Sequence, residues 1–229
     1  EEILNFIAGV NSINELTNTE YKIPVSISVG VNQESYDLID ALSDVWHPLR
    51  KSEPFSIDKT NISVDFITID IAHGHSIKME KMIKYIRVKL PNVFIIAGNV
   101  STLEAVEDLA EWGADAAKVG IGPGSACTTW PATGFGSRNC QASVVKECSE
   151  HYLPIIADGG IRVPGDIAKS LVLGATMIMV GGMMSGFKDS PGNLIDVNGQ
   201  KKKEFWGSAS QFQSNKKNRI EGTKYLIDF

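Results

Sequence analysis

The sequence predicts an α/β protein in which strands and helices alternate. Two observations carry this prediction: short runs of β-branched and apolar residues recur along the chain, and the segments between them space their apolar residues by three and four. Continuous apolar runs of this length are typical of buried parallel strands. Six strand–helix repeats can be counted, whereas a closed (β/α) barrel has eight, so a doubly wound open sheet also fits this pattern.

The strands and helices can be assigned in order. The six predicted strands are 25–31, 66–72, 93–97, 116–121, 154–157 and 177–180. Helical spacing is clearest after the first strand, at Leu38, Ile39, Leu42 and Val45, and after the second, at Met79, Met82, Ile83, Ile86 and Leu90. Such repeats of strand and helix predict βα units.

Helix boundaries are marked by capping residues and glycines. Ser101 and Glu104 have the spacing of a capping box, which predicts that a helix begins there. Gly113 stands where that helix should end, and Gly174 should end the helix that begins near Pro164.

Two stretches interrupt the repeats. Residues 47–63 form an insertion between a helix and a strand, to which no function is assigned. From residue 188 onward, Asn198-Gly199 between 194–197 and 203–206 predicts a β-hairpin. The basic run Lys201 to Lys203 is read as a solvated loop.

Composition restricts the class of protein. The chain has 229 residues, 43% of them hydrophobic, and a net charge of -5, which argues against nucleic-acid or anionic-membrane partners. No apolar run reaches the roughly 20 residues that span a bilayer, and the acidic start is unlike a signal peptide. We therefore expect a soluble, cytoplasmic protein.

Glycine clusters follow several predicted strands, where close backbone approach to a ligand is useful. They are Gly120 to Cys127, Asp158-Gly159-Gly160 and Gly181-Gly182. The last two clusters suit a phosphate held by backbone N–H groups. A turn requirement is the more common reason for any single glycine, but three clusters at the same ends of strands favour a binding site.

The chain has three cysteines, and their spacing indicates neither a disulfide framework nor a zinc site. Cys127 follows a glycine-rich loop at a strand end, which favours a nucleophile, whereas Cys140 and Cys148 are interpreted as structural. His73 and His75 lie in a strand-end loop without a third metal ligand, so they are interpreted as loop or cofactor-side residues.

Eight motifs follow one another along the chain, at 26–31, 70–76, 97–100, 118–127, 133–136, 156–162, 165–170 and 207–210. In this order they resemble the motifs of the family of GMP reductases and IMP dehydrogenases. The resemblance implies a (β/α)8 TIM barrel in which 1–229 is a single, partial catalytic domain. Two strands are then expected before residue 1 and a closing helix after Phe229, with a hairpin or flap at about 188–225 on the catalytic face.

The resemblance also implies an activity: NADPH-dependent reductive deamination of GMP to IMP and ammonia, a reaction of purine salvage. Cys127 would attack C2 of the purine to give a covalent thioimidate, and Thr129 with Glu221 would handle the proton that lets ammonia leave. A homotetramer is the expected assembly.

Binding residues follow from the same resemblance. The expected substrate-binding set is Ser125, Asp158, Gly159, Gly160, Gly181, Gly182, Gly207, Ser208, Ala209, Arg219 and Gly222. The nicotinamide side is expected at Asp70, Ile71, Ala72, Asn99, Ile121 and Gly122. Backbone carbonyls of Gly122, Gly124 and Cys127 resemble the family's site for a monovalent cation such as K⁺.

This sequence departs from its relatives at Trp130, where many have a basic residue, and at Asn218, near an arginine position of some relatives. Two alternatives remain. An IMP dehydrogenase would oxidise IMP to XMP with NAD, but it needs a long flap with an Arg-Tyr pair, and the segment between Gly207 and Glu221 is short and has no Tyr. A non-catalytic nucleotide-binding barrel would not need Cys127, Thr129 and Glu221 together.

Overall fold

The structure, a computed structural model, describes residues 2–17, 23–45, 64–136, 141–150, 152–207 and 225–228. The chain forms two compact units, the first made of 1–98 with 108–116 and the second of 99–107 with 117–229. The predicted insertion at 47–63 lies outside the described residues. Among the described helices, none has the length and apolar character that crossing a bilayer requires.

The six predicted strands are confirmed, and all pair in parallel. They are β1 (Ser26–Val29), β2 (Phe66–Asp70), β3 (Phe94–Val100), β4 (Ala116–Val119), β5 (Ile155–Asp158) and β6 (Met177–Met179). β2 lies between β1 and β3 in the first unit, and β5 lies between β4 and β6 in the second.

The order of the strands decides between the two predicted sheet types. Asp115, just before β4, donates its N–H to Ile95 of β3, and Gly120, just after β4, donates to Val100 at the end of β3. Neighbours therefore follow chain order from β1 to β6. A doubly wound sheet would reverse this order at its switch point, so the fold is that of a partial (β/α) barrel.

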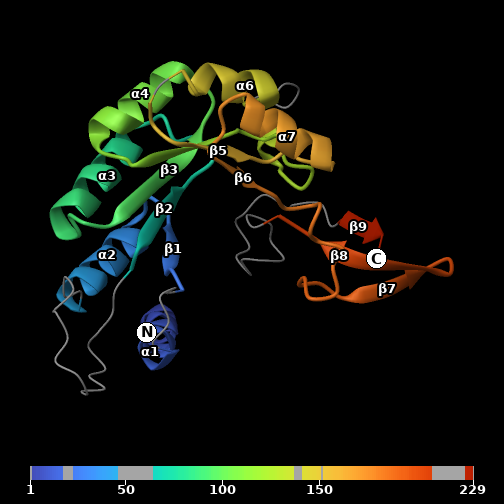
Figure 1. Ribbon diagram of the computed structural model, residues 1–229, viewed down its shortest axis with the longest axis horizontal. Helices are drawn as coiled ribbons and strands as arrows, with labels where there is room; N and C mark the ends of the chain where they lie inside the picture. Colours follow the sequence, from blue (N-terminus) through green and yellow to red (C-terminus); the bar gives the residue numbers. More distant parts are fainter. Residues whose placement is uncertain are drawn as a thin grey trace. The chain divides into compact units, whose positions relative to one another are not determined.

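Helices connect these strands as the apolar spacing predicts. They are α1 (Glu2–Thr17), α2 (Gln33–Val45), α3 (Ile77–Lys89), α4 (Leu103–Trp112), α5 (Thr129–Thr133), α6 (Gln141–Cys148) and α7 (Pro164–Val172). In the first unit, α2 and α3 lie along the same face of β1 and β2 (Figure 1). In the second unit, α6 and α7 contact β5 and β6 respectively.

The core lies between strands and helices. All four residues of β4 are buried, as expected for a strand covered on both faces. In α3, Met79, Met82, Ile83 and Ile86 are buried completely, and burial of each such side chain contributes roughly 1.5–3 kcal/mol. The helical spacing seen in the sequence is therefore the buried face of this helix.

One predicted helix start was wrong by a residue. Helix α4 begins at Leu103, and the Thr102 hydroxyl accepts a hydrogen bond from Ala105 N at 3.2 Å. Thr102 is thus the capping residue, and Ser101 lies one residue too early for that role. Both residues have a hydroxyl that can cap, so the sequence pattern did not distinguish them.

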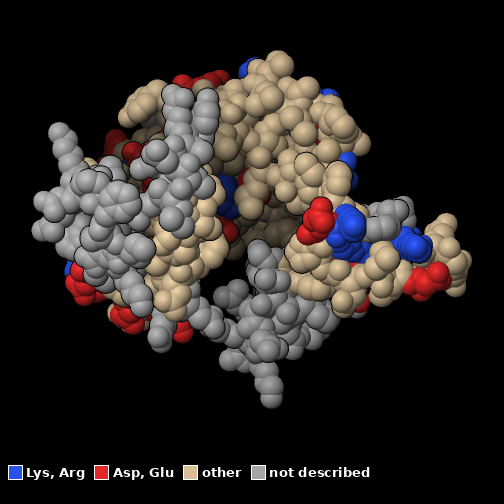
Figure 2. Space-filling model, turned by 60° about the horizontal axis from the view of Figure 1, so that its bottom comes forward, with Lys and Arg blue, Asp and Glu red and all other residues tan. Residues whose placement is uncertain are grey.

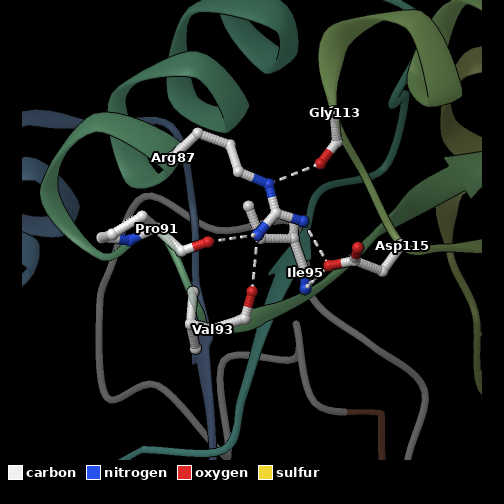
Figure 3. Close-up of polar contacts among 6 residues, drawn as sticks. All are labelled: Arg87, Pro91, Val93, Ile95, Gly113 and Asp115. Atoms are coloured by element: carbon white, nitrogen blue, oxygen red, sulfur yellow. Dashed lines mark hydrogen bonds and ion pairs between the residues drawn. The ribbon is translucent and has the colours of Figure 1, made fainter. Parts of the chain in front are cut away.

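Arg87, near the end of α3, joins three connecting segments of the first unit (Figure 3). Its guanidinium donates to the carbonyl of Gly113 at 2.8 Å and of Val93 at 2.6 Å, and it pairs with the Asp115 carboxylate. Asp115 in turn accepts from Ile95 N at 2.7 Å. The end of α3, the start of β3 and the turn after α4 are thereby held together.

The predicted hairpin is confirmed and belongs to a second, antiparallel sheet. It consists of β7 (Leu194–Val197) and β8 (Gln200–Phe205), with β9 (Tyr225–Asp228) added on the far side of β8. Asn198 and Gly199 have φ of 56° and 81°, the left-handed pair that a type I′ turn requires. The sequence analysis did not predict β9.

The reading of Lys201 to Lys203 as a solvated loop was wrong. These residues lie in β8, and Lys203 is only 3% exposed. Its ammonium donates to the carbonyls of Phe187 and Lys188 at 2.6 and 2.9 Å, which compensates for the loss of water around the charge. Figure 2 shows charged side chains of both signs on this sheet, so it is not a one-sign basic surface.

Gly174, which ends α7 as predicted, gives a first test of the fold. Its φ is +107°, and a Cβ there would clash with the Ser149 side chain. Gly174→Ala is expected to lower the free energy of unfolding by about 2 kcal/mol, because the backbone conformation and the contact both oppose a side chain. Urea denaturation followed by circular dichroism measures the change.

Gly9→Ala is the matched control. Gly9 lies within α1, where a Cβ would meet nothing within 4 Å. The same substitution should here raise the free energy of unfolding by about 0.5–1 kcal/mol, since alanine restricts the unfolded chain more than glycine. Equal effects at the two positions would contradict the assigned turn at Gly174.

Candidate active site

The second unit contains a pocket of about 450 Å³ that brings about half of the predicted site residues together. Its lining residues are Gly124 to Thr129, Asp158 to Arg162, Met179 to Met183, Phe205 and Gly207. The first three of these segments lie at or after the carboxyl ends of β4, β5 and β6, the face on which barrel enzymes bind their ligands. Its volume falls in the range of pockets for small molecules, which is about 300–1,000 Å³.

Cys127 lies at the end of the loop that follows β4. A turn in which Cys127 N donates to the Gly124 carbonyl at 3.1 Å directs the chain into the short helix α5. The half-buried Cys127 thiol is 3.4 Å from the hydroxyl of Thr129. A nucleophilic sulfur and a hydroxyl that can transfer a proton are therefore adjacent in the pocket.

The loop after β5 packs directly against this cysteine loop. Gly159 has a φ of +84°, and a Cβ on it would lie 3.1 Å from Gly124 N. A glycine is needed here because the two backbones approach closely in a conformation that favours glycine. The loop after β6 is also near, since a Cβ on Gly182 would lie 3.6 Å from the Ser125 hydroxyl.

Asp158 stands at the end of β5 and belongs to a hydrogen-bonded network beside the pocket. Its Oδ2 atom accepts from Lys118 Nζ at 2.6 Å and from Asn99 Nδ2 at 2.8 Å. Asn99 Nδ2 also donates to the carbonyl of Gly120 at 2.6 Å. The residues come from β3, β4 and β5, so three adjacent strands fix one carboxylate.

The backbone N–H groups at the start of α7 are already bound by the carboxylate of Asp166, a residue of the same helix. Asp166 accepts hydrogen bonds from Arg162 N at 3.0 Å and Val163 N at 3.2 Å. These bonds, with that from Arg162 the stronger influence, lower the pKa of Asp166 below its usual value. An anion in the pocket would therefore use the backbone of the glycine turns rather than the Arg162 and Val163 N–H groups.

Several lining residues were not predicted from the sequence. Arg162 and Met183 come from the loops after β5 and β6, Met179 is the last residue of β6, and Phe205 comes from β8. Phe205 approaches the glycine turn, because a Cβ on Gly181 would lie 3.9 Å from its ring. No local pattern marked Phe205, since its place in the pocket depends on how the hairpin folds back within the unit.

The residues expected on the nicotinamide side are divided between the two units. Asp70, Ile71 and Ala72 lie at the end of β2 in the first unit, where Ile71 N donates to the Gly98 carbonyl. In the second unit, Ile121 is buried and Gly122 faces Trp130, whose Cβ is 3.4 Å from where a Cβ on Gly122 would be. These five residues are not among those that line the pocket.

Part of the predicted site lies outside the described residues. Glu221 of the predicted catalytic set belongs to that part, as do the predicted substrate residues Ser208, Ala209, Arg219 and Gly222. Gly207 is described and lines the pocket, where a Cβ on it would lie 3.0 Å from the Ala126 carbonyl.

The other cysteines and His75 are not among the residues that line the pocket. Cys148 is completely buried, and burial raises the pKa of its thiol to about 12, so it is inert at neutral pH. Cys140 lies outside the described residues. His75 pairs with Asp108 at 2.6 Å and lies beside Trp112. Within the described part of the chain, no three His, Cys, Asp or Glu residues are placed to bind a metal ion.

Comparison with known proteins gives one consistent family. Residues 57–227 match the family model described as the IMP dehydrogenase / GMP reductase domain. The chain is 47% identical over 205 residues to a GMP reductase of Lactobacillus acidophilus, an alignment that covers 89% of this chain and 58% of that protein.

Two further relatives give the same result. A GMP reductase of Clostridium acetobutylicum is 48% identical over 205 residues, covering 89% of this chain and 58% of that protein. A GMP reductase of Lysinibacillus sphaericus is 46% identical over 222 residues, covering 96% of this chain and 63% of that protein. The chain thus spans about three fifths of the length of these relatives.

Proposed function

This chain belongs to the IMP dehydrogenase / GMP reductase family, and from that premise we propose that it carries the active site of an NADPH-dependent GMP reductase. The enzyme would convert GMP into IMP and ammonia in purine salvage. One observation carries the proposal: a single pocket joins Cys127 and Thr129 to the glycine turns after β5 and β6. A nucleophile and an anion-binding backbone are what a covalent reaction on a nucleotide needs.

Cys127 would begin the reaction. Its thiolate adds to C2 of the guanine base, and the 2-amino group, once protonated, leaves as ammonia to give a covalent thioimidate. The Thr129 hydroxyl, 3.4 Å from the sulfur, would pass a proton to the leaving amine, and we assign Glu221 as the group that supplies this proton. A hydride then adds to C2, the C2–S bond breaks, and IMP is released with the cysteine restored.

The pocket would hold the nucleotide at both ends. Ser125 and the turns Gly159-Gly160 and Gly181-Gly182 would bind the 5′-phosphate, because hydroxyl and backbone N–H groups suit an anion. Asp158 would accept from the ribose hydroxyls. Gly207 and the segment that follows it would contact the base, together with Arg219 and Gly222.

The nicotinamide group, when bound, supplies the hydride. We assign its binding to Asp70, Ile71, Ala72, Asn99, Ile121 and Gly122. One feature fits this assignment: Asn99 Oδ1 is buried and has no hydrogen-bond partner within the described structure, so an amide N–H of a ligand could satisfy it. We assign a K⁺ ion to the carbonyls of Gly122, Gly124 and Cys127, and we propose a cytoplasmic homotetramer from the family resemblance alone.

The related reaction, oxidation of IMP to XMP with NAD, is the second candidate. It would use the same cysteine and phosphate turns but would hydrolyse the covalent intermediate, which requires a base that activates water. The segment between Gly207 and Glu221 contains no tyrosine for an Arg-Tyr pair. Reductive deamination is therefore favoured.

Absorbance at 340 nm tests the choice with the full chain. GMP with NADPH should give a loss of absorbance, and IMP with NAD should give none. NADH formed from IMP would assign the chain to the dehydrogenase reaction. Silence in both assays with GMP still bound would favour a non-catalytic nucleotide-binding barrel.

A further inference from the structure

Lys118 is a buried cation that the proposed chemistry does not use. It lies in β4, a strand whose four residues are all buried, and its side chain is only 6% exposed. Removing an ammonium group from water costs several kcal/mol unless a partner compensates for the loss. The partners of this ammonium group therefore indicate the role of Lys118.

The charge of Lys118 meets one oxygen of Asp158. Lys118 Nζ and Asn99 Nδ2 both donate to Oδ2, at 2.6 and 2.8 Å. Asn99 is itself fixed by its second hydrogen bond, to the Gly120 carbonyl. Two donors on Oδ2 hold the plane of the carboxylate and leave Oδ1 as the oxygen that can accept from a ligand in the pocket, which Asp158 lines.

We propose that Lys118 is a positioning residue that orients Asp158 so that its Oδ1 accepts from the vicinal hydroxyls of the nucleotide's ribose. This inference rests on the proposed function, because it takes GMP as the ligand. Lys118 acts through Asp158 and not by touching the nucleotide, since its side chain is buried and is not among the residues that line the pocket.

Ligand binding by the Lys118→Met variant tests the proposal, because methionine keeps the length of the side chain and removes the charge. Calorimetry would compare GMP with 2′,3′-dideoxy-GMP, which lacks both hydroxyls. Lys118→Met should weaken GMP binding about tenfold, as expected for losing a charged hydrogen bond. Binding of the dideoxy nucleotide should change less than about twofold, because it makes no bond to Asp158.

Two further variants keep the test valid if Lys118→Met folds poorly. Asp158→Asn removes the carboxylate, and Lys118→Met with Asp158→Asn removes both charges together, so no unpaired charge stays buried. The double variant should bind GMP as weakly as Asp158→Asn alone, because Lys118 acts only through that carboxylate. Urea denaturation of each variant reports on folding.

The outcomes separate the inference from the proposed function. The positioning role would be overturned if Lys118→Met lost equal affinity for GMP and the dideoxy nucleotide, or if the double variant bound GMP more weakly than Asp158→Asn alone. GMP binding by the unmodified chain would still support the proposed function. Failure of the unmodified chain to bind GMP would overturn both. A loss confined to GMP and absent in the Asp158→Asn background supports the proposal.

Discussion

Cys127→Ala is expected to reduce turnover of GMP by about four orders of magnitude or more, while GMP still binds. The proposed reaction forms a bond between sulfur and C2, and Cys127 is the one cysteine among the described residues that line the pocket. Removing the nucleophile from enzymes with covalent intermediates typically costs rate factors of about 10⁴–10⁶. Binding should survive because the phosphate turns and Asp158 lie on other strands.

Single-turnover absorbance at 340 nm, with GMP affinity measured by calorimetry, checks this expectation. Cys148→Ala is the matched control: that thiol is completely buried in the second unit, and burial raises its pKa to about 12. The control should lose roughly 1–2 kcal/mol of stability, as for a large-to-small core change, and keep its rate. Comparable loss of rate in both variants would refute the role of Cys127 as nucleophile.

The strands and the glycine loops were predictable because their signals are local. A strand buried on both faces is mostly apolar, so the run 116–121 predicted β4 without knowledge of its neighbours, even though it contains Lys118. The pair Asn198-Gly199 predicted the turn between β7 and β8, because few other residues adopt a left-handed backbone conformation. The clustering of Cys127 with Gly159 and Gly182 followed once parallel strands placed their carboxyl ends at one edge.

Other features depend on pairs of residues far apart in the chain. Lys118 and Asp158 are separated by 40 positions, and a lone lysine in an apolar run carries no sign of its partner. Lys203 resembled a solvated charge because the carbonyls that it binds belong to residues 187 and 188. Strand β9 pairs with β8 across 19 intervening positions. Because no short turn joins the two strands, the sequence has no local pattern from which this pairing could be predicted. Such contacts come from tertiary packing, which a periodic pattern does not encode.

Arg87→Ala should lower the free energy of unfolding by about 2–3 kcal/mol, the largest loss of stability that we expect from a single polar side chain of the first unit. The guanidinium serves the carbonyls of Gly113 and Val93 and the Asp115 carboxylate at once (Figure 3). Its removal leaves part-buried acceptors without their donors, at a cost of about 1–3 kcal/mol for each group that water cannot reach. Because Asp115 is about one-third exposed, water should recover part of its loss.

Arg87→Lys and Lys84→Ala complete the test by urea denaturation. A lysine keeps the charge but cannot donate in three directions from one plane, so it should recover less than half of the lost stability. Lys84 lies on the same helix, and its exposed pair with Glu80 should contribute less than about 0.5 kcal/mol. If Arg87→Lys were as stable as the original chain, charge alone would account for the effect and the planar network of hydrogen bonds would not. If Arg87→Ala cost no more than Lys84→Ala, the three segments would be held in place by apolar packing instead.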